Sequence, residues 1–208
     1  MTTEVGLRER KKRRTRELIA DTAWRLFAER GFDHVPVAEI ASAAEVSEAT
    51  VFNYFATKED LVFHRMEAFE QELLGSIRDR REGESIVEAF GRFVLKPRGF
   101  LASDDPGANE GMRAAARVIT GSPALLARER EILESYTTTL AAFIAKEQGM
   151  GADDIEAWVV ANALIGVHRA LIGYAHRQAL GGVDNRRIAR NLRTHGERAL
   201  DLLEHGIG

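Results

Sequence analysis

Two short helical patterns joined by a tight turn, over residues 37–58, restrict the fold of this chain more than any other feature. The segment reads VAEIASAAEVSEATVFNYFATK, and its first half repeats apolar residues at the spacing of one helix face: Val37, Ile40, Ala41 and Ala44. Ser47 then stands where an N-cap hydroxyl accepts a hydrogen bond from a first-turn amide. The helix that follows has its own apolar face, made of Val51, Tyr54 and Phe55. The segment therefore predicts a pair of helices.

The other faces of the second helix carry Glu48, Thr50 and Asn53, whose side chains form hydrogen bonds. A short helix with an apolar back and a hydrogen-bonding front suits the major groove of DNA, where base edges present a readable pattern of donors and acceptors. The alternative is an ordinary buried helical hairpin, because such units are common. Periodicity alone does not separate these two interpretations.

The residues on either side of the pair favour DNA binding. Upstream, the run RERKKRRTR over residues 8–16 contains only one acid. Such a basic arm can enter a narrow minor groove beside a major-groove helix, although charge runs at chain termini are often only solvated. Downstream, Thr57 and Asp60 predict a capping box at the start of a further helix. Lys58 would then approach a phosphate at that helix terminus.

These segments resemble the TetR family of bacterial transcriptional regulators. The resemblance covers residues 8–62 and depends on RELIADTAWRLFAERGFDHV, VAEIASAAEVSEATVFNYF and TKEDLV. It implies a DNA-binding helix-turn-helix domain with a basic N-terminal arm in residues 1–57, and a helical ligand-binding and dimerisation domain in residues 58–208. The residues expected to contact DNA are Arg13, Arg14, Arg16, Ser47, Glu48, Thr50, Phe52, Asn53, Tyr54 and Lys58.

Four positions depart from the usual pattern of the family or of DNA readers. Pro36 suits the first helical position of the first docking helix but offers no side-chain cap where the family has Ser or Thr. Glu45 stands in the turn where the family favours Gly, and a left-handed backbone there would carry strain of order 1 kcal/mol. Phe52 replaces the usual Tyr and leaves only apolar contact. Glu48 either reads a cytosine amino group or is a solvated charge stabilised by the helix dipole.

Composition narrows the class of protein. The chain has 208 residues, no cysteine and only four prolines, and strand-like alternation is scarce, so we expect an all-α fold of about nine helices. The lack of cysteine excludes disulfides and thiolate zinc sites and fits a cytoplasmic protein. No apolar run approaches the roughly 20 residues of a membrane helix, and no signal peptide is recognisable. The formal net charge of −3 argues against a protein that coats DNA with its whole surface.

Helical periodicity predicts long helices over residues 12–30, 58–80, 153–180 and 184–204, among others. The first has a core-facing stripe and ends at Gly31. The stripe consists of Leu18, Ile19, Thr22, Ala23, Leu26 and Phe27. The helix 153–180 is expected to begin with a capping box of Asp153 and Glu156.

Small residues on the helix 153–180 indicate close approach by another helix. Gly166 and Gly173 are seven residues apart on one face, and each costs the helix about 1 kcal/mol relative to Ala. Together with the helix 184–204, this helix can form a four-helix bundle with a second copy, which resembles the dimer interface of the family. The interface residues expected are Gly166, Arg169, Gly173, Ile188, Leu192 and Ala199. A two-fold homodimer implies a palindromic operator, and the alternative is packing of both helices within one chain.

A small-molecule site is expected in the same helical domain. Its candidate apolar lining is Phe69, Phe90, Phe93 and Trp158, and its candidate polar residues are Arg113, Arg117, Asn162, His168 and Arg169. Arg113 and Arg117 share one helix face, so together they can meet an anionic group. The C-terminal sequence resembles a TetR subgroup that senses acyl-CoA-like molecules, which implies a largely apolar effector.

An enzyme and an architectural DNA protein are the competing classes of function. The six histidines show no H-E-x-x-H spacing, and the sequence has neither a glycine-rich phosphate loop nor a G-x-S-x-G elbow. We therefore expect no catalytic residues, no metal and no cofactor. Our interpretation is a cytoplasmic, homodimeric, ligand-responsive regulator that binds double-stranded DNA and has no membrane partner. Its action as a repressor is implied only by the family resemblance.

Overall fold

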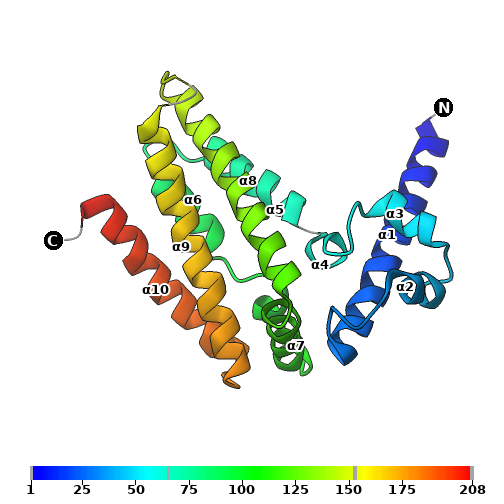
Figure 1. The fold of residues 1–208 in the computed structure, drawn as a ribbon. Coiled ribbons are helices and arrows are strands. Elements are labelled where there is room, and N and C mark those ends of the chain that lie inside the picture. The colour runs from blue at the N-terminus through cyan, green and yellow to red at the C-terminus, as the bar shows by residue number, and fades with distance from the viewer. Residues whose placement is uncertain (1, 65, 152–153, 207–208) are drawn as a thin grey trace. The chain divides into compact units, whose positions relative to one another are not determined.

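The computed structural model describes residues 2–64, 66–151 and 154–206, and every regular element in those ranges is a helix (Figure 1). This confirms the all-α fold. The elements are α1 (Thr2–Arg30), α2 (Val37–Ala43), α3 (Glu48–Tyr54), α4 (Asp60–Phe63), α5 (Met66–Arg78), α6 (Ile86–Val94), the 3-10 helix η1 (Gly99–Ala102), α7 (Ala108–Thr120), α8 (Pro123–Glu147), α9 (Ile155–Leu180) and α10 (Asn185–His205).

The chain divides into two compact units. Unit 1 comprises Met1–Arg65 and Arg117–Arg128, and unit 2 comprises Met66–Ala116 and Glu129–Gly208. The ends of α7 and α8 that flank their connection therefore belong to unit 1, and the rest of both helices belongs to unit 2. The expected functional boundary between residues 57 and 58 stays a prediction.

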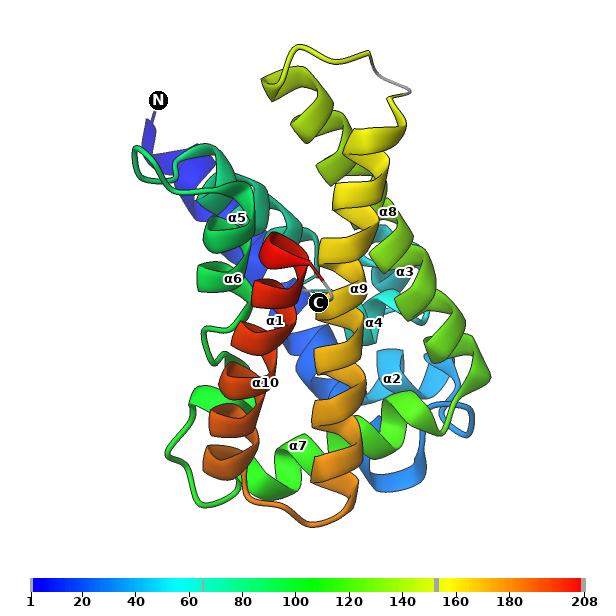
Figure 2. The same cartoon turned by 90° about the vertical axis from the view of Figure 1, so that its left-hand side faces the viewer.

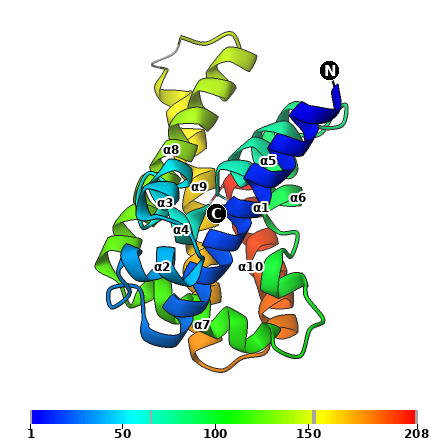
Figure 3. The same cartoon turned by 90° about the vertical axis from the view of Figure 1, so that its right-hand side faces the viewer.

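Unit 1 is built on α1, which packs against α2 and α4, while α2 packs against α3 (Figure 3). Ile19, Ala23 and Phe27 have no exposed surface and form the centre of its core, as their helical spacing predicts. Leu18 was expected in the same stripe, but it is 51% exposed. Thr22 and Leu26, which follow Leu18 along the same side of the helix, are buried, so only the first residue of this row is open.

The segment Arg117–Arg128 completes unit 1. Leu125 joins the apolar core of the unit without any exposed surface. The Ser122 hydroxyl donates to Asp33 Oδ1 at 2.8 Å, and the Arg128 guanidinium donates from Nη2 to Asp60 Oδ1 at 2.9 Å. Two side-chain contacts between residues far apart in the sequence thus hold this segment against the N-terminal helices.

Two predicted helix boundaries were wrong. α1 begins at Thr2 instead of near Lys12, so the basic arm is the first part of a long helix. Lys, Arg and Glu are strong helix formers, and Arg13 lies 3.9 Å from Glu17 one turn on. The predicted helix 58–80 is divided into α4 and α5, which raises the number of helices from nine to ten in the described residues. Near this division His64 Nδ1 lies 3.1 Å from the Leu61 carbonyl, a contact that competes with continuation of the helix.

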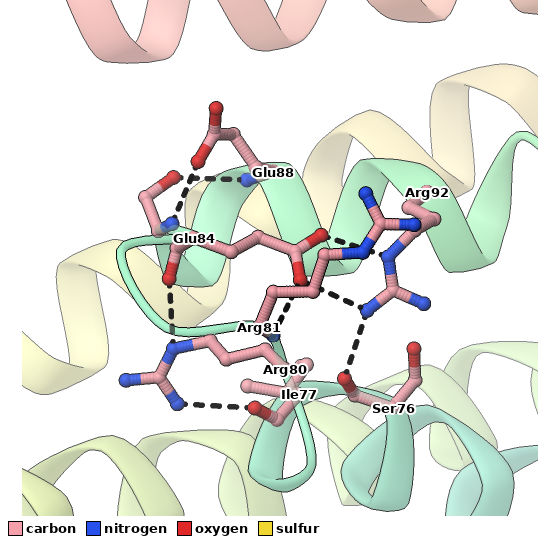
Figure 4. A network of polar contacts seen from close by, with 8 residues as sticks. Ser76, Ile77, Arg80, Arg81, Glu84, Glu88 and Arg92 are labelled. Carbon is pink, nitrogen blue, oxygen red and sulfur yellow. Dashed lines mark hydrogen bonds and ion pairs between the residues drawn. The ribbon is translucent and has the colours of Figure 1, made fainter.

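A polar network orders the turn between α5 and α6 in unit 2 (Figure 4). Glu84 accepts from Arg92 Nε at 2.7 Å and from the Arg81 amide at 2.9 Å. Hydrogen bonds from Arg92 hold the pKa of Glu84 below its usual value. Ser85 and Glu88 form a capping box at the start of α6. The turn therefore fixes α6, whose residue Phe90 is fully buried in the unit 2 core.

Helices α9 and α10 run side by side in unit 2 (Figures 1 and 2). Asp154 is the N-cap of α9, and its side chain accepts from the Glu156 amide at 3.0 Å. The sequence predicted Asp153 as this cap, but Asp153 lies outside the described residues. Asp184 caps α10 by accepting from the Arg187 amide at 3.0 Å.

By length and composition alone, α9 could cross a membrane, which the sequence analysis did not anticipate. Its many Ala, Val, Leu and Ile residues make the average apolar, although Asn162, His168 and Arg169 interrupt any purely apolar run. A core helix of a soluble protein passes the same test, so this property carries little weight.

Candidate nucleic-acid interface and ligand cavity

Helix α3 is held by a capped N-terminus and an apolar back. The Ser47 hydroxyl accepts from the Thr50 amide at 3.0 Å and lies 2.8 Å from the Thr50 hydroxyl, so the predicted N-cap is confirmed. On the other side of the helix, Val51 and Phe55 are buried in the core of unit 1. An isolated helix of only seven residues would be unstable in water. The N-cap and the buried face together stabilise α3 in this protein.

The outer face of α3 is open. Glu48 and Asn53 are exposed, Phe52 is 50% exposed, and Thr50 and Tyr54 are half-buried. The Asn53 amide makes no side-chain hydrogen bond within the part of the chain that the structure describes, so its donor and acceptor can both serve a base edge. An adenine presents the complementary pair of atoms in the major groove. Figure 3 shows this helix beside α2 and α4 in unit 1.

The turn between α2 and α3 contains backbone strain. Glu45 has a φ of 56°, and it is the one residue other than glycine with a positive φ among the described residues. The left-handed conformation that the family's preference for glycine implies at this position is therefore present. Pro36 is extended and occupies the N-cap of α2 itself, one residue before the expected position, and no side chain caps that helix. The missing cap was correctly predicted.

Lys58 points elsewhere than the sequence predicted. The backbone amides and side chains of Thr57 and Asp60 do form the expected reciprocal hydrogen bonds, at 3.0 and 3.3 Å. However, α4 has only four residues, and the Lys58 ammonium donates to the Phe32 carbonyl at 2.7 Å and lies 4.1 Å from the centre of the Phe32 ring. Burial lowers the pKa of Lys58. In this structure the ammonium thus ties the segment after α3 to the end of α1, and a phosphate contact would require it to leave that site.

The basic half of α1 places its charges on a continuous helix. Arg13 and Arg14 are exposed, whereas Arg16 is half-buried and its guanidinium carbon lies 5.4 Å from the centre of the Phe55 ring. This cation–π contact holds Arg16 beside the end of α3. The basic arm is therefore part of a helix whose position relative to α3 is fixed by packing.

Unit 2 contains a cavity of about 220 Å³. Most of its lining is apolar, and its polar lining residues are Lys96, Arg98, His168 and His176. His168 is buried, its ring stacks on Phe69 with the ring centres 5.2 Å apart, and burial lowers its pKa to about 4. The imidazole is therefore neutral at pH 7.

Of the residues expected from the sequence to contact a ligand, Phe69 and His168 line this cavity. Phe90 and Phe93 are buried in the core of unit 2, and Trp158 packs against that core. Four polar candidates also lie elsewhere, and one of them, Arg169, is exposed. Asn162 is exposed and donates to the Trp158 carbonyl at 2.8 Å, Arg113 pairs with Glu110 at 3.2 Å, and Arg117 belongs to unit 1.

Sequence patterns marked His168 but not Lys96, Arg98 or His176, the other polar residues of the cavity. Lys96 and Arg98 lie in a stretch that reads as a loop, and His176 stands in a helical pattern without any motif around it. One signal could have identified these polar residues, namely the position of an arginine and of histidines next to apolar helix faces. Without the fold, this signal is weak. Their convergence depends on contacts between α5, α6 and α9.

The residues predicted for the dimer interface differ in how far they are exposed. Gly166 and Arg169 are exposed, and Gly173 and Ala199 are half-buried. Ile188 has no exposed surface because it packs with Ala116, Ala175 and Ala179, so its assignment to an interface is corrected. Leu192 is half-buried and lines the cavity.

Comparisons with known proteins match both halves of the chain. Residues 19–64 match the family model described as bacterial regulatory proteins, tetR family, and residues 98–207 match the model of the MftR C-terminal domain. The transcriptional regulator TcmR of Streptomyces glaucescens is 34% identical over 155 residues, covering 72% of this chain and 67% of that protein. The transcriptional regulator MftR of Mycobacterium tuberculosis is 28% identical over 167 residues, covering 80% of this chain and 81% of that protein.

Among solved structures, the transcriptional regulator FadR of Bacillus subtilis in complex with stearoyl-CoA has a similar fold. The TM-score is 0.55 with 20% sequence identity, covering 92% of this chain and 99% of that chain. At this identity the likeness concerns the fold alone. The relatives matched by sequence are transcriptional regulators, and none of the names describes an enzyme.

Proposed function

Because the chain belongs to the TetR family of bacterial transcriptional regulators, we propose that it is a cytoplasmic, homodimeric repressor that binds a palindromic operator and releases it when an effector binds. The single observation that carries the proposal is the open face of α3, whose hydrogen-bonding residues point away from a buried apolar back. A helix of this construction can enter the major groove without loss of its own packing.

Asn53 is the residue with which to test sequence reading. An amide that pairs with adenine through two hydrogen bonds contributes about 1–3 kcal/mol to discrimination, so Asn53→Ala should lose about 5- to 150-fold in affinity for the preferred site. Asp21→Asn, which changes an exposed residue of α1, serves as the matched control and should keep its affinity.

The measurement has two steps. Selection from random DNA defines the site preferred by the parent protein, and gel-shift titration then compares the variants on it. A short protected palindrome is expected in footprinting. Broad protection would indicate an architectural protein, and absence of protection by the folded protein would refute DNA regulation.

A second copy of the chain is the proposed partner of α9 and α10. Six of the nine exposed large hydrophobic residues lie on these two helices, namely Ile155, Val159, Val160, Leu180, Leu202 and Leu203. Gly166 supports the same proposal, because a Cβ atom built there would meet nothing within 4 Å in its own chain. Within the described residues no neighbour excludes a larger side chain here. Glycine costs the helix about 1 kcal/mol relative to Ala, and close approach by a helix of a second chain would explain its use.

The dimer can be tested by sedimentation at micromolar concentration. The parent chain should sediment as a dimer, and Gly166→Leu should shift it towards the monomer. Ala68→Leu adds the same side chain to an exposed position of α5 and should leave the dimer intact. A monomeric parent protein would contradict the proposed dimer.

The effector is proposed to be small and largely apolar, and similar to an acyl-CoA. The apolar lining of the cavity in unit 2 supports this class. The FadR structure was solved with stearoyl-CoA, which is a property of that protein and motivates the choice of ligands. Acyl-CoAs of increasing chain length should weaken operator binding in the gel-shift assay. If no chain length changes the affinity, this effector class is wrong although the regulator itself stands.

A further inference from the structure

The polar side chains that line the unit 2 cavity all belong to basic residues. Lys96, Arg98, His168 and His176 line it together with apolar side chains, and no carboxylate of the described residues does. A cavity with this lining has a net positive character. Its chemistry therefore favours a ligand that combines an apolar body with a negative charge.

Arg98 is placed to meet that charge. Its Nη1 donates to the Phe93 carbonyl at 2.6 Å and to the Lys96 carbonyl at 3.2 Å, which fixes the guanidinium at the end of α6. Its carbon Cζ lies 3.9 Å from the centre of the Phe93 ring, so one face is covered by an aromatic side chain. Within the described residues, Nε and Nη2 have no hydrogen-bond partner and the guanidinium forms no ion pair.

Partial burial of the Arg98 guanidinium makes it energetically unfavourable to leave this charge without an anionic partner. Burial lowers the pKa of Arg98, and the acid that partly offsets this effect, Glu72, is exposed and does not line the cavity. A partly desolvated guanidinium with free donors gains more from an anion than one in open water. The side chain is thus oriented and charged before any ligand arrives.

His168 adds a neutral polar group beside this charge. The imidazole is held against Phe69 by stacking, and it forms no hydrogen bond within the described residues. Burial and the nearby Arg98 both lower its pKa, so it stays uncharged at pH 7. A neutral imidazole offers one donor and one acceptor, and either can bind a polar atom next to the anionic group of a ligand.

We propose that the effector is an apolar organic anion, whose negative group pairs with Arg98 while a neighbouring polar atom bonds to His168. This inference builds on the proposed ligand-responsive function and specifies the ligand. A free carboxylate or the phosphate groups of a CoA thioester can supply the anion. The uncharged ester of the same chain lacks it and should bind poorly.

The test uses decanoate, methyl decanoate and decanoyl-CoA as probes in calorimetric titrations of the full chain. The parent protein should bind at least one of the two anions about 30-fold more tightly than methyl decanoate, the size expected for a pair that includes a partly buried charge. Whether decanoate or decanoyl-CoA is the tighter ligand identifies the source of the anion.

Variants assign the effect to residues. Arg98→Gln keeps a donor for the Phe93 carbonyl but removes the charge, so it should bind the preferred anion about 30-fold more weakly and methyl decanoate as before. His168→Phe keeps the stacked ring but loses the hydrogen bond, so its affinity for the preferred anion should fall about tenfold. Arg78→Gln, at an exposed position of α5 outside the cavity, should bind like the parent.

Several results would overturn the proposal. They are equal binding of decanoate and its methyl ester, unchanged affinity of Arg98→Gln for the preferred anion, or no binding of either anion by the parent protein. Operator affinity measured without ligand separates this failure from that of the proposed function. A protein that binds its operator but none of the anions refutes only the effector chemistry.

Discussion

Replacing Ser47 tests how the DNA-reading helix is held. In Ser47→Ala, the Thr50 amide loses its acceptor at 3.0 Å and becomes an unpaired first-turn donor. Loss of such a cap destabilises a helix by about 1 kcal/mol, which is a large effect for α3 because the helix has only seven residues. The equilibrium constant for forming α3 should therefore fall about fivefold.

Ser47→Asp separates the cap from any contact with DNA. An aspartate caps a helix about as well as a serine and interacts favourably with the helix dipole, so the stability of the parent should return. If Ser47 also lies at a phosphate, the added negative charge repels it. Ser47→Asp should then bind the operator at least about tenfold more weakly than the parent, despite its restored stability.

The assay is thermal and urea unfolding, followed by operator titration at fixed salt. For a chain of this size, a loss of 1 kcal/mol lowers Tm by about 2–4 °C. Ser42→Ala is the matched control, because Ser42 is an exposed serine of α2. If Ser47→Ala unfolds like the parent, the cap contributes nothing. If Ser47→Asp binds DNA like the parent, Ser47 lies away from the phosphates.

Three further outcomes are expected, each measurable by unfolding. The pKa of His168 is about 4 when folded and 6.5 when unfolded, so the unfolded chain binds more protons between these values and stability falls as the pH is lowered through them. His168→Gln should remove about 2 kcal/mol of the difference in unfolding free energy between pH 7 and pH 5, and an unchanged pH profile would contradict the neutral buried imidazole. Asp60→Asn should destabilise unit 1 by about 1 kcal/mol, since Arg128 loses its carboxylate partner in a half-exposed pair, whereas Asp79→Asn, in an exposed pair, should have almost no effect. Glu45→Asn should raise stability by about 0.5 kcal/mol because Asn tolerates a φ of 56° better, and a loss of stability would refute strain at this turn.

Local interactions were predicted well because their partners are close in the sequence. The cap of Ser47 on Thr50 spans three residues, as do the reciprocal bonds of Thr57 and Asp60. The strained turn at Glu45 was implied by the family resemblance, because the family favours glycine at this position. Such features depend on hydrogen-bond geometry within one turn of backbone, which the order of residues decides directly.

The sequence by itself therefore determined the helical class of the protein, the capped helix of the DNA-binding motif and the family resemblance. Only the tertiary structure decided that the Lys58 ammonium binds the Phe32 carbonyl, and that Arg98 and His168 line one cavity while Phe90 is core. These outcomes join residues that lie 26 to 70 positions apart, or on separate helices. Periodicity shows that a residue lies on the apolar face of its helix, whereas packing of the helices decides whether that face meets a core, a cavity or a second chain.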